Sequence, residues 1–418
     1  MVLLGIVVVF ATIYSLVKRY ETRMVLFTAG VLMATLSGNP LAGLNAFTKS
    51  MTTAGLIESI CSVMGFALVM RYTECDKHLI HLVANGLIKV RPLLIPGATL
   101  GTFAINIALP SAAGVSAAVG TIFIPILMAA GVHPATAAAA VYCGTFGSML
   151  SPGLSHNPFV AKIAGMNVMD VIRVHAKADV VGVLIGAATL TIVSYLLKEN
   201  KGYVAATGAA DKERFRPKLL FAVIPTLPVV ILVLGATGVV PVLKQVAVPP
   251  AMLIGTLIGV AATRTSPTGV TKAFFEGMGS AYGSILGIII AAGVFVGGME
   301  AIGLVKAFIN VLINAGPLAK VAAACGPFVL SVIAGSADAI SLAFNQAVSP
   351  HAPQFGISVV NMGSVATLSG ALGRTMSPIS GSAIICASLA GINPMDIAKR
   401  NAPGMIIAGI VTAFMLLL

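Results

Sequence analysis

The stretch from Gly370 to Pro378, Gly-Ala-Leu-Gly-Arg-Thr-Met-Ser-Pro, repeats the pattern of an earlier stretch from Gly144 to Pro152, Gly-Thr-Phe-Gly-Ser-Met-Leu-Ser-Pro. The same displacement along the chain carries Gly165-Met-Asn-Val-Met-Asp170 onto Gly391-Ile-Asn-Pro-Met-Asp396. Two correspondences at one spacing indicate that the chain contains two copies of one unit. In an apolar chain, a duplicated unit is typical of a secondary transporter.

The composition of the chain points to a membrane protein. Hydrophobic residues make up 58% of the 418 residues and charged residues only 9%, whereas soluble domains carry about 25% charged residues. Basic residues follow the first apolar run, Val2 to Val17, so we interpret this run as a membrane segment and not as a cleaved signal. The net charge of +12 follows the loops of the topology predicted below, and we expect no nucleic-acid partner.

One strongly polar stretch, residues 198–218, divides the chain and is interpreted as a cytoplasmic linker. Residues 1–197 then form a first repeat and residues 219–418 a second. We expect an all-α polytopic fold in which both repeats contain the same helices in the same order. Apolar runs predict these helices within residues 2–17, 24–36, 53–70, 92–130, 134–166 and 180–197, and within 219–238, 250–262, 278–296, 317–334, 340–348, 359–389 and 402–418.

Breaks rich in Ser, Gly and Pro interrupt the apolar runs at corresponding places in the two repeats. The first pair of breaks is 109–116 and 334–341, and the second pair is 151–158 and 377–382. Backbone groups freed at such breaks cannot face lipid. We therefore predict a re-entrant helical hairpin at the first break of each repeat and a broken transmembrane helix at the second.

If the hairpins do not cross the membrane, each repeat crosses it an odd number of times, and the second copy must be inverted. Most of the 25 Lys and Arg then lie on the side of Lys18 and Arg19, which we assign to the cytoplasm. Both termini, with Lys49 and Lys162, are predicted to face the exterior.

Half-helix ends at mid-membrane carry unpaired N–H groups and positive dipole ends, which can hold an anion. Hydroxyl and amide side chains gather at the predicted breaks. On this ground the candidate substrate-binding residues are Ser111, Ser151, Ser155, Asn157, Ser336, Thr375, Ser377 and Ser380. The alternative is that small and hydroxyl residues there only permit close helix packing.

Arg374 is the basic residue that we place deep in the membrane, at a cost of about 2.5–3.5 kcal/mol. A substrate carboxylate would offset this cost, because guanidinium matches carboxylate in bidentate geometry. A structural ion pair with Asp338 is the alternative, in which case Arg374 serves the fold rather than the substrate.

Three further residues are candidates for ion coupling. Asp338 lies at the second hairpin tip, where a carboxylate can bind a coupling cation or a proton. His156 lies in the first unwound stretch and titrates near neutral pH, although a histidine donating to a backbone carbonyl is an equal alternative. Asn345 follows the second tip, while Glu58, inside another apolar run, ranks below Asp338.

Motifs for catalysis are lacking in the sequence. It contains no His-Glu-x-x-His, no Gly-x-Ser-x-Gly and no phosphate-binding loop. The five cysteines show no metal-ligand spacing, and we expect them to be buried. We predict a gradient-driven carrier rather than an enzyme, with no metal site and no cofactor beyond Na⁺ or H⁺ as coupling ion.

The stretch Leu372-Gly-Arg-Thr-Met-Ser-Pro-Ile-Ser-Gly381, followed by Ile392-Asn-Pro394 and Lys399-Arg400, resembles the signature of the anaerobic C4-dicarboxylate carriers of the C type, within the ion transporter superfamily. Ala291-Ala-Gly-Val-Phe295 is similar too. The resemblance implies a homodimer in the inner (plasma) membrane of a bacterium, with a scaffold and a mobile part that moves as an elevator. The implied substrates are succinate, fumarate, malate or related anions, coupled to protons or sodium ions or exchanged.

Position by position, the resemblance also implies a set of anion-facing residues. These are Ser111, Ala112 and Gly114 in the first tip, Ser336 and Asp338 in the second, and Arg374, Thr375, Ser377 and Ser380 in the second broken helix. The chain departs from the family pattern in two places. The first broken helix, from Ser151 to Asn157, matches poorly, and Asp338 stands where a neutral amide is expected.

Two other transport classes remain open. In a cation/proton antiporter of the same superfamily, Asp338 would be the exchanging acid and Arg374 would serve structure. In a passive anion channel, flux would not saturate.

Overall fold

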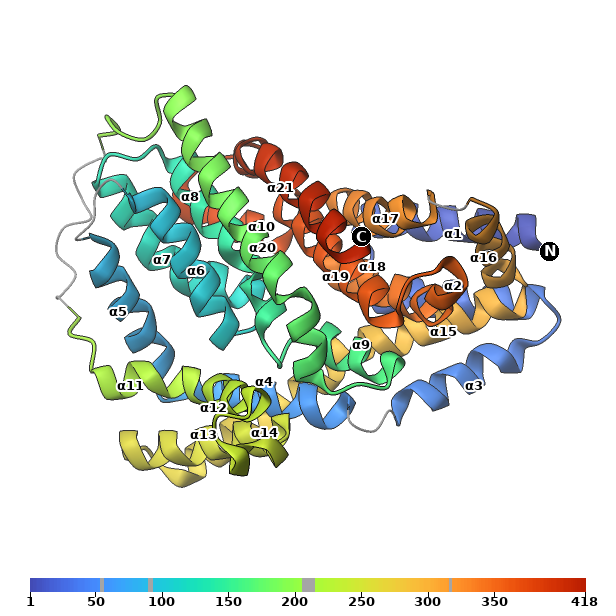
Figure 1. Ribbon diagram of the computed structural model, residues 1–418, viewed down its shortest axis with the longest axis horizontal. Helices are drawn as coiled ribbons and strands as arrows, with labels where there is room; N and C mark the ends of the chain where they lie inside the picture. The colour runs from blue at the N-terminus through green and yellow to red at the C-terminus, as the bar shows by residue number, and fades with distance from the viewer. Residues whose placement is uncertain (53–55, 89–92, 205–214, 316–317) are drawn as a thin grey trace.

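The computed structural model describes residues 1–52, 56–88, 93–204, 215–315 and 318–418. These residues form helices and no strands, as the sequence predicts. The molecule is elongated, with the N-terminus at one end of its long axis and the C-terminus near its middle (Figure 1).

The helices of the first repeat are α1 (Val2–Val17), α2 (Thr22–Leu36), α3 (Pro40–Met51), α4 (Leu56–Tyr72), α5 (Cys75–Ile88), α6 (Leu94–Ala108), α7 (Ala112–Ala129), α8 (Pro134–Cys143), the short helix η2 (Gly144–Leu150), α9 (His156–Ala164) and α10 (Val168–Leu196). The helices of the second are α11 (Leu219–Val223), η3 (Ile224–Thr226), α12 (Leu227–Thr237), η4 (Pro241–Gln245), α13 (Val248–Thr263), α14 (Pro267–Ala281), η5 (Tyr282–Leu286), α15 (Gly287–Ala301), α16 (Leu304–Ala315), α17 (Leu318–Ala334), α18 (Ala337–Ala347), η6 (Ser349–Phe355), α19 (Val359–Thr375), α20 (Gly381–Ala390) and α21 (Pro394–Leu417).

The order of helices repeats. Helices α2 to α7 correspond in turn to α13 to α18, the α8–η2 pair corresponds to α19, and α9 and α10 correspond to α20 and α21. The packing partners correspond as well, because α4 lies against α13 and α14 of the other half, whereas α15 lies against α2 and α3. In each half, one helix, either α4 or α15, therefore packs against two helices of the other half.

The four predicted breaks are present. Residues 109–111 separate α6 from α7, and residues 335–336 separate α17 from α18. Residues 151–155 separate η2 from α9, and residues 376–380 separate α19 from α20. The breaks fall at Pro, Gly and Ser because these residues end helices or accept the first N–H groups of the next one.

The apolar runs failed to predict some helices and predicted others too short. The sequence reading gave no helix for α3, α5 or α16 and no separate α14, since charged and amide residues interrupt their apolar faces. Helices α10 and α21 begin at Val168 and Pro394, more than a turn before the predicted starts, because polar first turns preceded the apolar stretch. The prediction that the cysteines are buried fails for Cys325, which is exposed.

Among the described residues, five helical stretches are long and apolar enough to cross a membrane: Ala112–Ala129, Val168–Leu196, Leu219–Thr237, Pro267–Ala301 and Pro394–Leu417. The fourth contains α14, η5 and α15 in one continuous helix of 35 residues. Several shorter apolar helices accompany them, including α1, α2, α6 and α13. The chain is therefore a multi-pass membrane protein by length and composition of its helices.

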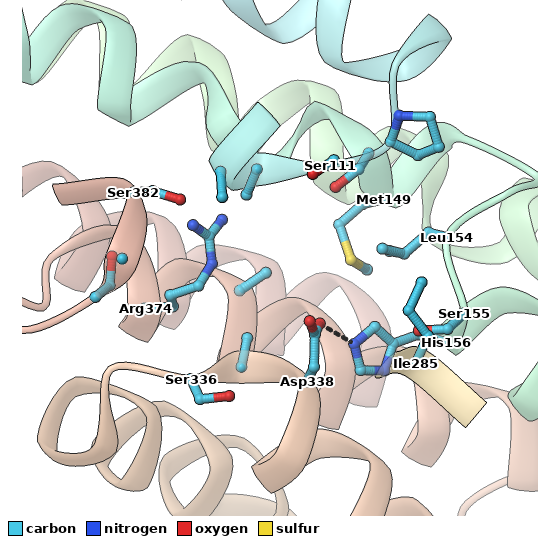
Figure 2. A pocket seen from close by; sticks show the side chains of 18 of the residues that line it. Ser111, Met149, Leu154, Ser155, His156, Ile285, Ser336, Asp338, Arg374 and Ser382 are labelled. Atoms are coloured by element: carbon cyan, nitrogen blue, oxygen red, sulfur yellow. Dashed lines mark hydrogen bonds and ion pairs between the residues drawn. The ribbon is translucent and has the colours of Figure 1, made fainter. Parts of the chain in front are cut away.

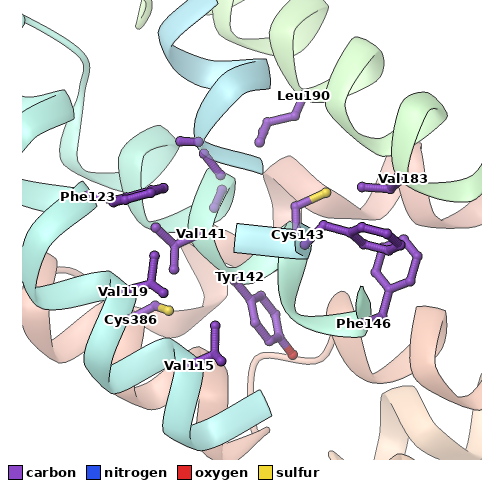
Figure 3. Packing of buried hydrophobic residues seen from close by; sticks show 14 of the residues in the cluster. Val115, Val119, Phe123, Val141, Tyr142, Cys143, Phe146, Val183, Leu190 and Cys386 are labelled. Atoms are coloured by element: carbon purple, nitrogen blue, oxygen red, sulfur yellow. The ribbon is translucent and has the colours of Figure 1, made fainter. Parts of the chain in front are cut away.

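The largest apolar core lies where the hairpin α6–α7 packs with α8, α10, α20 and α21. Figure 3 shows its centre, in which Phe123, Val141 and Phe146 are fully buried. Tyr142 is also fully buried there, and its hydroxyl lies 2.7 Å from Ser380 Oγ, at the second broken helix. This core thus connects the first hairpin to the break in α19–α20.

The repeated Gly-x-x-Gly pattern has a packing role in both halves. A Cβ added to Gly147 would lie 2.1 Å from the carbonyl oxygen of Phe103 in α6. A Cβ added to Gly373 would lie 2.2 Å from the carbonyl oxygen of Phe328 in α17. The glycines thus allow each broken helix to touch the backbone of the first arm of its own hairpin.

The start of the predicted linker is anchored to the helices. Glu199 accepts hydrogen bonds from Arg400 Nε at 2.7 Å and from the hydroxyl of Thr136, and its backbone carbonyl accepts from His133 N at 2.9 Å. Part of the predicted linker, residues 205–214, lies outside the described residues. Glu199 thus ties the end of the first repeat to α8 and α21.

Candidate functional site

A cavity of about 350 Å³ lies where the four breaks meet. Its wall includes the first residues of four helices, and Figure 2 shows their side chains converging on it from both halves of the chain. These residues are Ser111–Ala113 before and in α7, Ser155 and His156 at α9, Ser336–Asp338 at α18, and Ser380–Ser382 at α20.

The serines at these helix starts are N-cap residues. Ser111 Oγ accepts a hydrogen bond from Gly114 N at 3.1 Å, and Ser380 Oγ accepts one from Ala383 N at 3.2 Å. Ser155 and Ser336 occupy the same position before α9 and α18 without a side-chain bond to the helix. Because the first N–H groups of a helix lack acceptors within the helix and carry its positive dipole end, four such ends favour an anion in the cavity.

Arg374, in the last turn of α19, brings a guanidinium to the same cavity (Figure 2). Its Nη2 donates to the backbone carbonyl of Thr145 at 3.0 Å, and its guanidinium carbon lies 6.0 Å from the centre of the Tyr142 ring. Within the described part of the chain, Arg374 forms no ion pair with any carboxylate. The alternative of a structural ion pair with Asp338 is therefore not what the structure contains.

Asp338 pairs instead with His156, at 2.9 Å between Oδ1 and Nε2 (Figure 2). The histidine side chain is buried at 3% exposure, whereas 61% of the Asp338 side chain is accessible, and the accessible part faces the cavity. Among the described residues, His156 Nδ1 has no hydrogen-bond partner. The alternative that His156 donates to a backbone carbonyl is therefore wrong, because its bonded nitrogen faces a carboxylate.

The cavity brings together eight of the residues predicted for substrate or ion binding. They are Ser111, Ala112, Ser155, His156, Ser336, Asp338, Arg374 and Ser380. Ser148, Ser284 and Ser382 also line it and were not predicted.

Six other predicted residues lie outside the lining: Gly114, Ser151, Asn157, Asn345, Thr375 and Ser377. Thr375 and Ser377 are fully buried and donate to the backbone carbonyls of Ala371 and Val332. Asn345 donates to Thr367 Oγ1 at 3.0 Å and so joins α18 to α19. In this arrangement these side chains hold the frame around the cavity, as the packing alternative describes.

Asn157 belongs to a buried polar chain behind the first broken helix. Its Nδ2 donates at 2.8 Å to the carbonyl oxygens of Met149 and Ser151, which turns its Oδ1 toward His175 Nε2 at 3.2 Å. His175 Nδ1 in turn lies 2.5 Å from Asp179 Oδ2, and both side chains are almost fully buried. Since Asn157 Oδ1 accepts, His175 Nε2 carries a hydrogen, and one further proton lies between His175 and Asp179.

The sequence reading missed this pair. A His and an Asp four residues apart fall on one helix face, and two ionisable groups inside an apolar helix are rare, so the spacing was the available signal. Thr145 and Tyr142 were missed because nothing in the sequence links them to Arg374. Elsewhere in the described residues, no three His, Cys, Asp or Glu side chains gather as a metal site requires.

The family model for C4-dicarboxylate anaerobic carriers, DcuC, matches residues 2–418. An Escherichia coli (strain K12) protein named anaerobic C4-dicarboxylate transporter DcuC is 22% identical over 452 aligned residues, which cover 99% of this chain and 96% of that protein. A Haemophilus influenzae protein described only as an uncharacterised transporter is 41% identical over 279 residues, 64% of this chain and 100% of that protein.

A solved structure has a similar fold. MtrF of Neisseria gonorrhoeae, described as illuminating a class of antimetabolite efflux pumps, aligns with a TM-score of 0.63 over 89% of this chain and 83% of its own, at 14% identity. This likeness concerns the fold alone. The match of the family model over residues 2–418 shows that the protein belongs to the DcuC family of membrane transporters, whose members are carriers and not enzymes.

Proposed function

We propose that this member of the DcuC family is a secondary active transporter of small dicarboxylates of the succinate, fumarate and malate class in the inner membrane of a bacterium. The observation that carries the proposal is the meeting of four helix N-termini and the Arg374 guanidinium at one cavity. Positive dipole ends and a guanidinium are the groups that stabilise a carboxylate away from water. A C4-dicarboxylate fits a cavity of about 350 Å³ together with a few waters.

In the proposed binding mode, each end of the substrate meets a different set of donors. One carboxylate binds Arg374 and the N–H groups at the start of α20, near Ser380. The other binds the start of α7, near Ser111. The Ser111 hydroxyl already accepts from the backbone, so its own hydrogen points away from the helix and can donate to the substrate. The Ser380 hydroxyl is instead bonded to the Tyr142 hydroxyl at 2.7 Å, so it serves to hold the start of α20.

Coupling follows from the charges around the cavity. The ionisable side chains among its described lining residues are Arg374, Asp338 and His156. A dianion beside the Asp338 carboxylate is repelled unless a cation or a proton joins it, because like charges at close range strongly disfavour each other. We infer that Asp338 and His156 hold the coupling proton or sodium ion, and that exchange of one dianion for another is the alternative cycle.

The transport movement is proposed to be that of an elevator. The repeated helix order and the exchanged packing of α4 and α15 support two copies related by an inverted two-fold. In this proposal the two hairpins and two broken helices form the mobile part, and α2 to α4 with α13 to α15 form the scaffold. The family resemblance adds the expectation of a homodimer through that scaffold.

A cation/proton antiporter is the second candidate function. The observation in its favour is that Asp338, the acid that would exchange ions, pairs with His156, a second ionisable side chain at the cavity. In that case the acid would exchange ions, and Arg374 would bind only Thr145.

The test is a binding and transport screen with the purified full-length protein. Thermal stability is measured with millimolar succinate, citrate or acetate at two sodium concentrations, and [¹⁴C]succinate uptake is measured in liposomes. We expect succinate to raise the melting temperature more than citrate or acetate and to be taken up. Proton movement driven by sodium, without binding or uptake of any carboxylate, would establish the antiporter instead.

A further inference from the structure

A second cavity, of about 240 Å³, lies along the same four helices as the central one. Helices α4, α9 and α18 line the central cavity through Met64, His156 and Asp338, and they line the second cavity through Leu56, Phe159 and Gln346. The continuous helix η5–α15 does the same through Ile285 and Ile289. On each helix the second residue lies about one or two turns from the first. The two cavities therefore follow each other along one seam between the helices.

Buried apolar side chains lie between the two cavities. Ile60 of α4 stands midway between Met64 and Leu56, and Leu342 of α18 stands midway between Asp338 and Gln346. They pack in one cluster with Leu56, Phe159, Leu286 and Ile289, all at most 5% exposed. We refer to these six residues as the apolar plug, because their buried apolar side chains offer no polar partner to water or ions in the seam.

The second cavity is lined by charged side chains that the central site does not use. Lys49, in the last turn of α3, and Lys162, in the last turn of α9, both line this cavity. Neither lysine forms an ion pair in the described part of the molecule, and Glu300 lines the same cavity, also without an ion pair. Two lysines and one glutamate in the lining, none of them in an ion pair among the described residues, give the cavity a net positive charge.

We propose that the Lys49–Lys162 cavity is a second carboxylate-binding site, a vestibule that holds the dianion before it passes the apolar plug to the central site. This inference rests on the proposed function. In the predicted topology both lysines lie on the exterior side, so the vestibule serves exchange with the outside.

The two sites hold a dianion through different kinds of cationic group, and this difference suits the vestibule to brief binding. Lysine ammonium groups are flexible, strongly hydrated point charges, whereas Arg374 is a fixed planar fork held by Thr145. The vestibule therefore attracts a dianion by its field and releases it quickly, and Glu300 weakens the attraction further. The central cavity then binds the same dianion through oriented donors.

The test uses initial rates of dicarboxylate uptake into liposomes at low ionic strength. We expect Lys49→Gln and Lys162→Gln each to raise KM by about three- to tenfold with an unchanged saturating rate, and Glu300→Gln to lower KM, because each change alters the local field on a dianion. Added choline chloride at about 1 M should remove these differences, since it shortens the screening length to about 3 Å. Lys306→Gln is the matched control, an exposed lysine of α16 outside both cavities.

The outcomes separate the vestibule from the proposed function. If the wild-type protein transports dicarboxylate while the lysine variants keep its KM, the vestibule is overturned and the transport function stands. A Glu300→Gln variant whose KM rises as in the lysine variants would overturn the vestibule too. Absence of any dicarboxylate uptake by the wild type would overturn both. Lys→Arg variants with wild-type KM, beside Lys→Gln variants with raised KM, would support the role of charge.

Discussion

Replacing Arg374 is the sharpest test of the central site, because the guanidinium combines charge with a fixed geometry. Arg374→Lys keeps the positive charge but loses the planar fork and the bond to the Thr145 carbonyl. Of the five guanidinium N–H groups, Thr145 engages one closely, at 3.0 Å, and its hydroxyl makes only 3.4 Å contacts. At least two donors therefore remain for a substrate carboxylate.

The expected change in KM follows from the number of guanidinium donors that remain for the substrate. A hydrogen bond to a charged group contributes about 1.5–3 kcal/mol. Losing one of two such bonds in Arg374→Lys should raise KM by about 10- to 150-fold, because every 1.4 kcal/mol corresponds to a factor of ten. Losing both in Arg374→Ala should bring uptake below detection at millimolar substrate.

The assay is [¹⁴C]succinate uptake into liposomes, together with the melting temperature of each variant with and without succinate. Thr145→Val is the matched control, because toward Arg374 it removes only the long hydroxyl contacts and keeps the carbonyl bond. It also removes the bond from the Thr145 hydroxyl to the Tyr142 carbonyl, which does not involve the guanidinium, so its KM should rise by no more than a few-fold. Uptake by Arg374→Lys within twofold of wild type, or stabilisation of Arg374→Ala by succinate, would refute the assignment of Arg374 to the substrate.

Three further predictions concern coupling, packing and pH. Asp338→Asn should change the dependence of uptake on pH or sodium more than the preference among dicarboxylates, and an unchanged ion dependence in liposome assays would remove Asp338 from coupling. Gly373→Ala should destabilise the protein by about 3 kcal/mol, because its Cβ would meet a backbone oxygen of α17 at 2.2 Å, while Gly279→Ala, with open space around it, should not lower the melting temperature. Burial raises the pKa of the Glu199 carboxyl, but hydrogen bonds from Arg400 and Thr136 outweigh this and hold its pKa below the ordinary value of 4.5. Its contribution is therefore present above pH 4.5 and lost as pH falls through the lowered pKa. Glu199→Gln should lower the melting temperature at pH 7, and a deficit that does not shrink as the pH falls below 4.5 would contradict this reasoning.

The sequence predicted those parts of the fold that depend on local backbone chemistry. The breaks at Ser111, Ser151, Ser336 and Ser377 were found because Pro, Gly and Ser end or cap helices wherever they stand. Helices such as α3 and α5 were missed because their apolar faces are short and their stability comes from packing on other helices.

In the candidate site too, the sequence indicated the residues that stand out locally but not the contacts between distant residues. The N-cap serines and Arg374 were identifiable, since each is exceptional within its own stretch. The pairing of Asp338 with His156 joins residues from different halves of the chain, and the sequence analysis considered only Arg374 as a structural partner of Asp338. The support of Arg374 by Thr145 and the buried His175–Asp179 pair likewise depend on tertiary neighbours.

The backbone contacts at Gly147 and Gly373 limit how the molecule can open. A hairpin that swung away alone would pull apart main chains that touch with no side chains between them, and new polar surface would face the membrane interior. The seam between α4 and α15 on one side and α9 and α18 on the other is faced with leucine, isoleucine and phenylalanine, over which neighbouring helices can glide at little cost. Relative motion in this carrier should therefore occur at that apolar interface, and each hairpin should move together with its broken helix as a rigid body.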